Sequence, residues 1–102
     1  MLETRKANGE VITGSVKLVH AAGMHARPAV KLTKLAKKFQ AQISIRASKN
    51  AEWINAKSVS KIMALRAVRD SIIEIKASGA DAEAAVSALV NLVATDFPDT
   101  DR

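Results

Sequence analysis

The sequence predicts an α+β fold, an open-faced β-sandwich with the element order βαββαβα. Two observations support this prediction. Four short segments alternate apolar and polar residues, as strands with one buried face do, and three other segments repeat apolar residues at helical spacing. Because each strand has a single apolar face, we expect a four-stranded antiparallel sheet with three helices on one side and solvent on the other.

The predicted strands are short, and each buries one face. In the first strand Ile12, Val16 and Leu18 alternate with more polar neighbours, and in the last strand Ile73 and Ile75 do the same. Loops rich in Ser, Asn, Gly and Lys separate the strands from the elements that follow them. The strands are expected at residues 11–20, 42–46, 52–56 and 71–77.

Three helices complete the pattern. Ser58 is a typical N-cap residue and is expected to begin the second helix, with Met63 on its apolar face. Asp81 is expected to cap the third helix, and Pro98 prevents that helix from continuing. The first helix is predicted over residues 26–39, where the apolar face consists of Leu32, Leu35, Ala36 and Phe39.

The length of the chain, 102 residues, suits one domain, which we expect to span residues 11–95. Residues 1–10 are polar and lack periodicity, which is typical of a flexible leader or linker. Residues 96–102, with the sequence DFPDTDR, are expected to form an acidic tail.

The composition excludes several classes of site. The chain has no cysteine, which excludes disulfides and thiolate metal sites and fits a cytoplasmic protein. No run approaches the ~18 apolar residues of a membrane-spanning helix, so no membrane association is expected. His20 has no acidic cluster near it in the sequence. We therefore expect neither a metal nor a cofactor and interpret His20 as a residue at the end of a strand.

The net charge of +6 favours an acidic partner. Lysine and arginine gather between Arg27 and Arg69, whereas the C-terminal end is acidic. Only 3% of the residues are aromatic, so the chain lacks the stacking series that binders of single-stranded nucleic acid use. We therefore favour a local docking face for acidic proteins, with a nucleic-acid-binding domain as the less favoured alternative.

The motif GMHARPA, residues 23–29, places a histidine, an arginine and a proline where the first helix begins. Proline is tolerated in the first turn of a helix because the N–H that it lacks would have no partner there. Pro28 therefore places His25 at or near the N-cap. The unpaired backbone N–H groups and the positive end of the helix dipole make this position suitable for an anion.

This arrangement suits covalent phosphoryl transfer through His25. The oxygens of a phosphoryl group on the ring would lie over the backbone N–H groups of Ala26 and Arg27. The guanidinium of Arg27 could add charge-assisted hydrogen bonds. Spacing alone also allows a plain surface histidine at a helix start, so the residues by themselves leave both interpretations open.

The segment GMHARPAVKL closely resembles the active-site segment of HPr, the histidine phosphocarrier of the bacterial phosphoenolpyruvate-dependent phosphotransferase system. The resemblance runs from about Val11 to Val93. It includes NAKSVSKIMAL at residues 55–65 and IKASGADAEAAVSAL at residues 75–89. Three separate matches occur in the expected order on the βαββαβα pattern.

The resemblance implies a role for each matching residue. His25 would accept a phosphoryl group on Nδ1 from enzyme I and pass it to an enzyme IIA-type acceptor domain in sugar transport. Arg27 would steady that group, and Ser58 matches a serine that an HPr serine kinase phosphorylates in some branches. The protein would then be a monomeric, stoichiometric carrier and not an enzyme acting on a small substrate. The partners would dock around His25 on Met24, Lys31, Lys34, Lys57, Val59 and Ile62.

The branch within the family is left open by the sequence. Ala22 stands where many HPr proteins have Asn or Ser, and the apolar residue before GMHARPA resembles the nitrogen-related phosphocarrier NPr. The basic first helix and the SGAD turn are more similar to sugar-branch HPr. The alternative is a domain of a multiphosphoryl transfer protein, such as the phosphotransferase subunit of the dihydroxyacetone kinase system.

Overall fold

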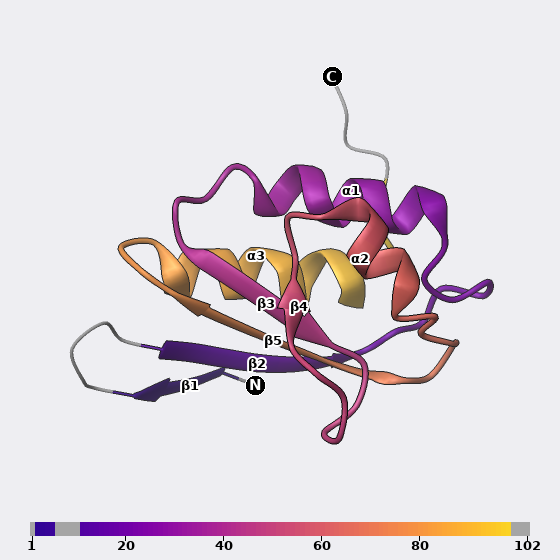
Figure 1. Cartoon of the computed structure of the whole chain (residues 1–102), viewed down its shortest axis with the longest axis horizontal. Coiled ribbons are helices and arrows are strands. Elements are labelled where there is room, and N and C mark those ends of the chain that lie inside the picture. The colour runs from indigo at the N-terminus through magenta and orange to yellow at the C-terminus, as the bar shows by residue number, and fades with distance from the viewer. Residues whose placement is uncertain (1, 6–10, 99–102) are drawn as a thin grey trace.

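All three helices of the described chain lie on one face of a single antiparallel sheet, as the alternation in the strands predicts (Figure 1). The computed structural model describes residues 2–5 and 11–98. The strand order is β1-β2-β5-β3-β4. In chain order the elements are β1 (Leu2–Arg5), β2 (Val11–Lys17), α1 (Ala26–Ala36), β3 (Gln42–Arg46), β4 (Ile54–Asn55), α2 (Val59–Ala64), β5 (Ile72–Ser78) and α3 (Ala82–Ala94).

The sheet has one strand more than the sequence predicts. β1 lies in the segment expected to be a flexible leader and pairs with β2, with Leu2 opposite Gly14 and Arg5 opposite Val11. Backbone hydrogen bonds along the edge of a sheet can hold a polar strand that shows no apolar alternation. The rest of the expected leader, residues 6–10, lies outside the described residues.

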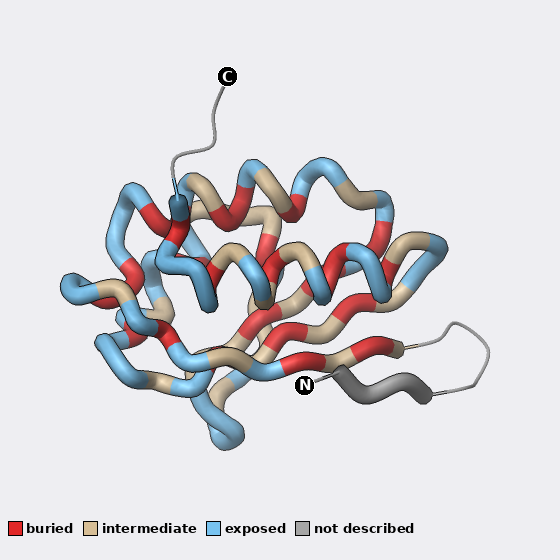
Figure 2. Tube along the Cα trace, turned by 180° about the vertical axis from the view of Figure 1, so that it is seen from behind, coloured by how far each residue is buried: buried red, intermediate tan, exposed pale blue. Residues whose placement is uncertain are grey.

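The strand register gathers the apolar side chains on the face beneath the helices. Ile12 lies opposite Ala77, and Ile45 lies opposite Ile75. Figure 2 shows buried residues where the helices face the sheet and exposed residues on their outer surfaces. The largest side chains of this core come from both layers and include Ile12, Leu18, Leu32, Ile45, Ile62, Ile73, Ile75, Val86, Leu89 and Val93.

The opposite face of the sheet carries charged residues around a tryptophan. Arg46 pairs with Glu74, with 2.6 Å between Nε and Oε1. The guanidinium of Arg46 and the ammonium of Lys76 lie 4.3 and 4.5 Å from the centre of the Trp53 ring. These cation–π contacts place Trp53 on the face away from the helices.

Two helices differ from their predicted extents. α1 ends at Ala36, and the chain continues in tighter turns in which Lys38 and Phe39 donate to the carbonyls three residues earlier, Leu35 and Ala36. α2 has only six residues, and it buries Ile62 but exposes Met63. The sequence predicts Val59, Ile62 and Met63 on one apolar face, with Met63 as a core or contact residue. Ile62 packs in the core, whereas Met63 is exposed, because so short a helix turns only one narrow face inward.

Part of the expected acidic tail packs on the domain. Asp96 and Phe97 have positive φ angles of 61° and 52°, and the Phe97 N–H donates to the Leu92 carbonyl at 2.9 Å. This turn closes the C-terminal end of α3 and buries the Phe97 side chain. In the described part of the chain no helix is long and apolar enough to cross a membrane.

Asp81 stands at the N-cap position of α3 but does not cap that helix with its side chain. Its carboxylate instead accepts hydrogen bonds from the backbone N–H groups of Gln40 and Ala41 at 2.9 and 2.8 Å. These bonds, that from Gln40 above all, lower the pKa of Asp81. The residue therefore ties the chain between α1 and β3 to the start of α3.

We predict that Asp81→Asn lowers the melting temperature at neutral pH. Each carboxylate oxygen accepts from one backbone N–H, whereas the Asn side chain would turn its NH2 donor toward one of these two N–H groups. The pKa of Asp81 is lower in the folded chain than its ordinary value of 3.8. Its contribution is therefore present above that value and is lost as the pH falls through the lower folded value.

The difference in melting temperature between Asp81→Asn and the wild type should shrink on acidification from about pH 7 to about pH 3. Glu52→Gln, on an exposed loop, serves as the control and should show no such dependence. A difference that stays constant over this range would contradict the role of the charged carboxylate.

Candidate functional site

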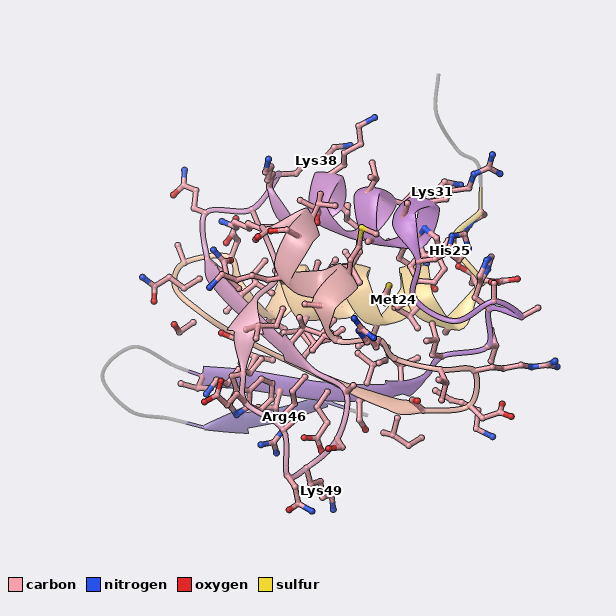
Figure 3. All side chains as sticks on the ribbon, turned by 45° about the vertical axis from the view of Figure 1, so that its right-hand side comes forward. Met24, His25, Lys31, Lys38, Arg46 and Lys49 are labelled. Carbon is pink, nitrogen blue, oxygen red and sulfur yellow. The ribbon has the colours of Figure 1, made fainter. Side chains whose placement is uncertain are left out.

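The site begins at the N-terminal end of α1. His25 is the N-cap residue in extended conformation, with φ −119° and ψ −162°, and its carbonyl accepts the first helical hydrogen bond from the Ala29 N–H at 3.0 Å. Pro28 lies buried in the first turn, where its missing N–H costs nothing. The sequence prediction of both positions is confirmed. Figure 3 shows His25 at the end where the chain enters α1 and Lys38 at the opposite end.

The first turn of α1 offers unused donors beside the histidine. Among residues 2–5 and 11–98, nothing accepts a hydrogen bond from the N–H groups of Ala26 and Arg27, and the His25 side chain does not cap them. Arg27 is exposed and forms no ion pair within the same residues. No acidic residue lies in the first turn. Two free amides, the helix dipole and a guanidinium therefore surround the position that an anion on His25 would take.

The loop before His25 is anchored to the chain that follows α2. Gly23 has a positive φ of 74°, and the N–H of the next residue, Met24, donates to the Ala67 carbonyl at 2.9 Å. The Met24 side chain is buried in the core. The expectation that Met24 is an exposed docking residue was therefore wrong, since the anchored loop turns this side chain inward and leaves His25 outside.

His25 contacts a second histidine that the sequence did not indicate. Its Nε2 lies 3.1 Å from Nε2 of His20, and Nδ1 of His20 lies 2.8 Å from Oδ1 of Asp96. The His25 Nδ1 has no hydrogen-bonding partner in the described residues. Strand β2 ends at Lys17, so His20 lies in the following loop and not at a strand end as expected. No spacing rule connects His20 with a residue 76 positions later.

Residues 12–95 match the family model described as the PTS HPr component phosphorylation site. The chain belongs to the HPr family of phosphocarriers. The phosphocarrier protein HPr of Neisseria meningitidis is 33% identical over 79 residues, which are 78% of this chain and 86% of that protein. The phosphocarrier protein NPr of Proteus mirabilis is 37% identical over 82 residues, 80% of this chain and 90% of that one.

One relative is much longer, and the fold agrees with a solved structure. The multiphosphoryl transfer protein of Vibrio cholerae is 36% identical over 78 residues, which are 76% of this chain but only 20% of that protein. The crystal structure of HPr from Thermoanaerobacter tengcongensis has a TM-score of 0.76 and 34% identity, and the match covers 83% of this chain and 93% of that one.

The lysines expected to surround the HPr-like site lie in different places. The Lys57 ammonium donates to the Phe39 carbonyl at 2.8 Å, beyond the C-terminal end of α1. A helix of 11 residues spans about 16 Å, so Lys57 lies near the opposite end of α1 from His25, and its place on the docking face stays a prediction. Lys31 is partly buried and donates to the Phe97 carbonyl at 2.9 Å. Lys34 is exposed on α1 and available to a partner.

The apolar residues expected on the docking face also differ. Ile62 is fully buried in the core and was wrongly included, and Val59 is only partly exposed. Exposed apolar side chains include Met63 on α2 and two that the sequence did not single out, Val30 on α1 and Val68 after α2. Helical periodicity places Ile62 on the buried face of α2, but it does not predict how narrow that face is in so short a helix.

We predict that Gly23→Ala destabilises the protein and displaces His25. A Cβ at this position would lie 2.6 Å from the Ala67 carbonyl oxygen, and the residue would keep a positive φ. Such strain typically costs about 1–3 kcal/mol. Denaturant unfolding measures the loss, and Ala22→Ser in the same exposed turn is the matched control. If Gly23→Ala unfolds at the denaturant concentration of the wild type, the loop is not anchored as described.

Proposed function

We propose that His25 accepts a phosphoryl group from enzyme I and passes it to an enzyme IIA-type acceptor domain. One observation carries this proposal: an exposed imidazole stands at the N-cap of α1, beside two backbone N–H groups that nothing in the described chain accepts. Membership of the HPr family supports it. The protein is then a cytoplasmic, monomeric carrier that is itself phosphorylated and released in each cycle.

The transfer uses the free nitrogen of His25. A lone pair on Nδ1 attacks the phosphorus atom while the bond to the donor breaks and its electron pair returns to the donor. The phosphoryl oxygens then accept hydrogen bonds from the amides of Ala26 and Arg27, and the Arg27 guanidinium offsets their charge. Because these donors are already in place, the site needs little reorganisation to hold the group.

We predict that His25→Ala abolishes phosphorylation. Wild-type protein incubated with phosphoenolpyruvate and enzyme I should gain the mass of one phosphoryl group, and the label should be labile in acid and stable in base. Intact-mass spectrometry measures the gain. If the variant keeps the label, on His20 for example, His25 is not the acceptor.

We predict that Arg27→Ala slows phosphoryl transfer by roughly ten- to a thousandfold, because it removes a charge that stabilises the developing anion. The arginine is exposed and unpaired among the described residues, so stability should change by no more than about 0.5 kcal/mol. Rapid-quench kinetics with phosphorylated enzyme I measures the rate. Lys49→Ala, in an exposed loop that Figure 3 shows far from His25, is the control for general charge loss. Equal rates for both variants would remove Arg27 from the site.

Docking of acidic partners is proposed on the surface around His25. Lys34 and Lys57 stay in the proposed face, and the buried Ile62 is removed from it. The exposed side chains added to it are Val30, Met63 and Val68. Surface cations act mainly on the encounter rate, so association with these partners should slow as salt rises.

The downstream branch is assigned by offering the phosphorylated protein to acceptor domains of the sugar and nitrogen branches. A multidomain parent, as in the Vibrio cholerae relative, is the second candidate arrangement.

Ser58 is the proposed site of an HPr serine kinase. Its hydroxyl caps α2 by accepting from the Lys61 N–H at 3.3 Å, as the sequence predicts. A negative charge at a helix N-terminus is favourable, so the fold should tolerate phosphorylation. The charge would instead repel an acidic partner.

We predict that Ser58→Asp keeps its melting temperature within a few degrees but accepts phosphate from enzyme I markedly more slowly. Ser48→Asp adds the same charge beside Lys49, in a loop that Figure 3 shows far from His25, and should transfer normally. Calorimetry and rapid-quench kinetics measure the two effects. If Ser58→Asp transfers as fast as Ser48→Asp, Ser58 serves as a helix cap alone.

A further inference from the structure

We propose that His20 and Asp96 are positioning residues that hold His25 in the tautomer with a nucleophilic Nδ1. This inference rests on the proposed function of His25 and adds the two residues that prepare its ring. Asp96, His20 and His25 form one continuous chain of contacts, 2.8 Å from Oδ1 to Nδ1 and 3.1 Å from Nε2 to Nε2.

The carboxylate determines the position of every proton in this chain. An ionised carboxylate only accepts hydrogen bonds, so Nδ1 of His20 must carry a proton. Nε2 of the neutral His20 ring then has a lone pair and accepts the proton on Nε2 of His25. Neutral His25 carries no second ring proton. Its Nδ1 therefore keeps the lone pair that attacks phosphorus.

Contacts with the turn after α3 and with Phe97 hold Asp96 and His20 in position. Asp96 follows α3 in the left-handed conformation, in the turn that the Phe97 N–H closes onto the Leu92 carbonyl. The Phe97 ring meets the His20 ring edge to face, with 6.1 Å between centroids. Lys31 donates to the Phe97 carbonyl at 2.9 Å and so ties this turn to α1, the helix that His25 begins.

The hydrogen-bonded chain from Asp96 through His20 to His25 also stabilises the phosphorylated state. When Nδ1 forms its bond to phosphorus, His25 loses no proton, and its ring gains a formal positive charge. The proton on Nε2 remains in the hydrogen bond to His20, and the carboxylate of Asp96 at the end of the chain offsets the charge. The donor recovers the electron pair of the bond that breaks, so the step balances without a further reactant.

Stability alone does not account for this arrangement. The Asp96 side chain is 52% exposed, and that of His20 is 26% exposed. A hydrogen bond between such exposed side chains contributes little to the free energy of unfolding. The pair lies outside the core and meets the solvent-exposed ring of His25.

The first test reads the tautomers of the unphosphorylated protein. Long-range ¹H–¹⁵N NMR spectra of the neutral rings should show His25 protonated on Nε2 and His20 protonated on Nδ1. The opposite tautomer of His25 would overturn the proposal. Because this measurement needs no phosphoryl transfer, its result is independent of the proposed function.

The second test compares two variants of His20. His20→Phe keeps a ring against Phe97 but cannot accept a hydrogen bond, and it should slow transfer to His25 by roughly ten- to a hundredfold, as loss of tautomer-fixing partners does at metal-bound imidazoles. His20→Gln offers an amide oxygen to the His25 Nε2 proton and should restore most of the rate.

Each outcome of the kinetic test supports or contradicts the role of the hydrogen bond between His20 and His25. Transfer at the wild-type rate in His20→Phe, or equal loss in both variants, would overturn the role of the hydrogen bond. A wild-type protein that takes up no label on His25 would instead contradict the proposed function, while the tautomer spectra would still decide the proton positions.

Discussion

The hydrogen bond from the Met24 N–H to the Ala67 carbonyl determines where the site lies. It is possible because Gly23 adopts a positive φ and brings no Cβ against that carbonyl. The bond turns Met24 into the core and leaves the following residue, His25, exposed as the N-cap of α1. The same loop, which begins before Gly23, also places the ring of His20 against the ring of His25.

A phosphocarrier must hold its phosphoryl group firmly enough to diffuse with it and loosely enough to give it away. Free backbone N–H groups meet this need, because they stabilise charge in both the carrier and the transition state without forming a bond to phosphorus. Pro28 fits the same purpose in the proposed mechanism, since it lacks an N–H and the Ala26 and Arg27 amides remain available for a phosphoryl group on His25. The partners need then bring only the phosphoryl group and a complementary surface.

Local sequence predicts those features that depend on a few consecutive residues. The alternation in β2, β3 and β5 gives the sheet and its buried face, and Pro28 with Ser58 gives the starts of two helices. β1 was not predicted, because backbone pairing with β2 holds it, and the four residues LETR show no apolar alternation that would indicate a strand.

The features of the site that the sequence did not predict depend on contacts between residues far apart in the chain. Asp96 reaches His20 only because α3 ends in a left-handed turn against α1, and Lys57 is drawn away from His25 by the Phe39 carbonyl. The sequence does not distinguish a lysine whose ammonium is free to contact a partner from one whose ammonium is hydrogen-bonded within the fold. In α2 the sequence placed Ile62 and Met63 on one apolar face, but only Ile62 is buried, because the six residues pack on α1 and β4 with a narrow face.

The central claim is that a phosphoryl group on Nδ1 of His25 rests on the N-terminus of α1. Heteronuclear NMR of the phosphorylated protein, labelled with ¹⁵N, tests it most directly through the phosphorus–nitrogen couplings and the amide shifts. Coupling of phosphorus to Nδ1 of His25, with the largest amide shifts at Ala26 and Arg27, is the predicted result. Coupling to Nε2 or to the His20 ring, or unchanged Ala26 and Arg27 amides, would contradict the account.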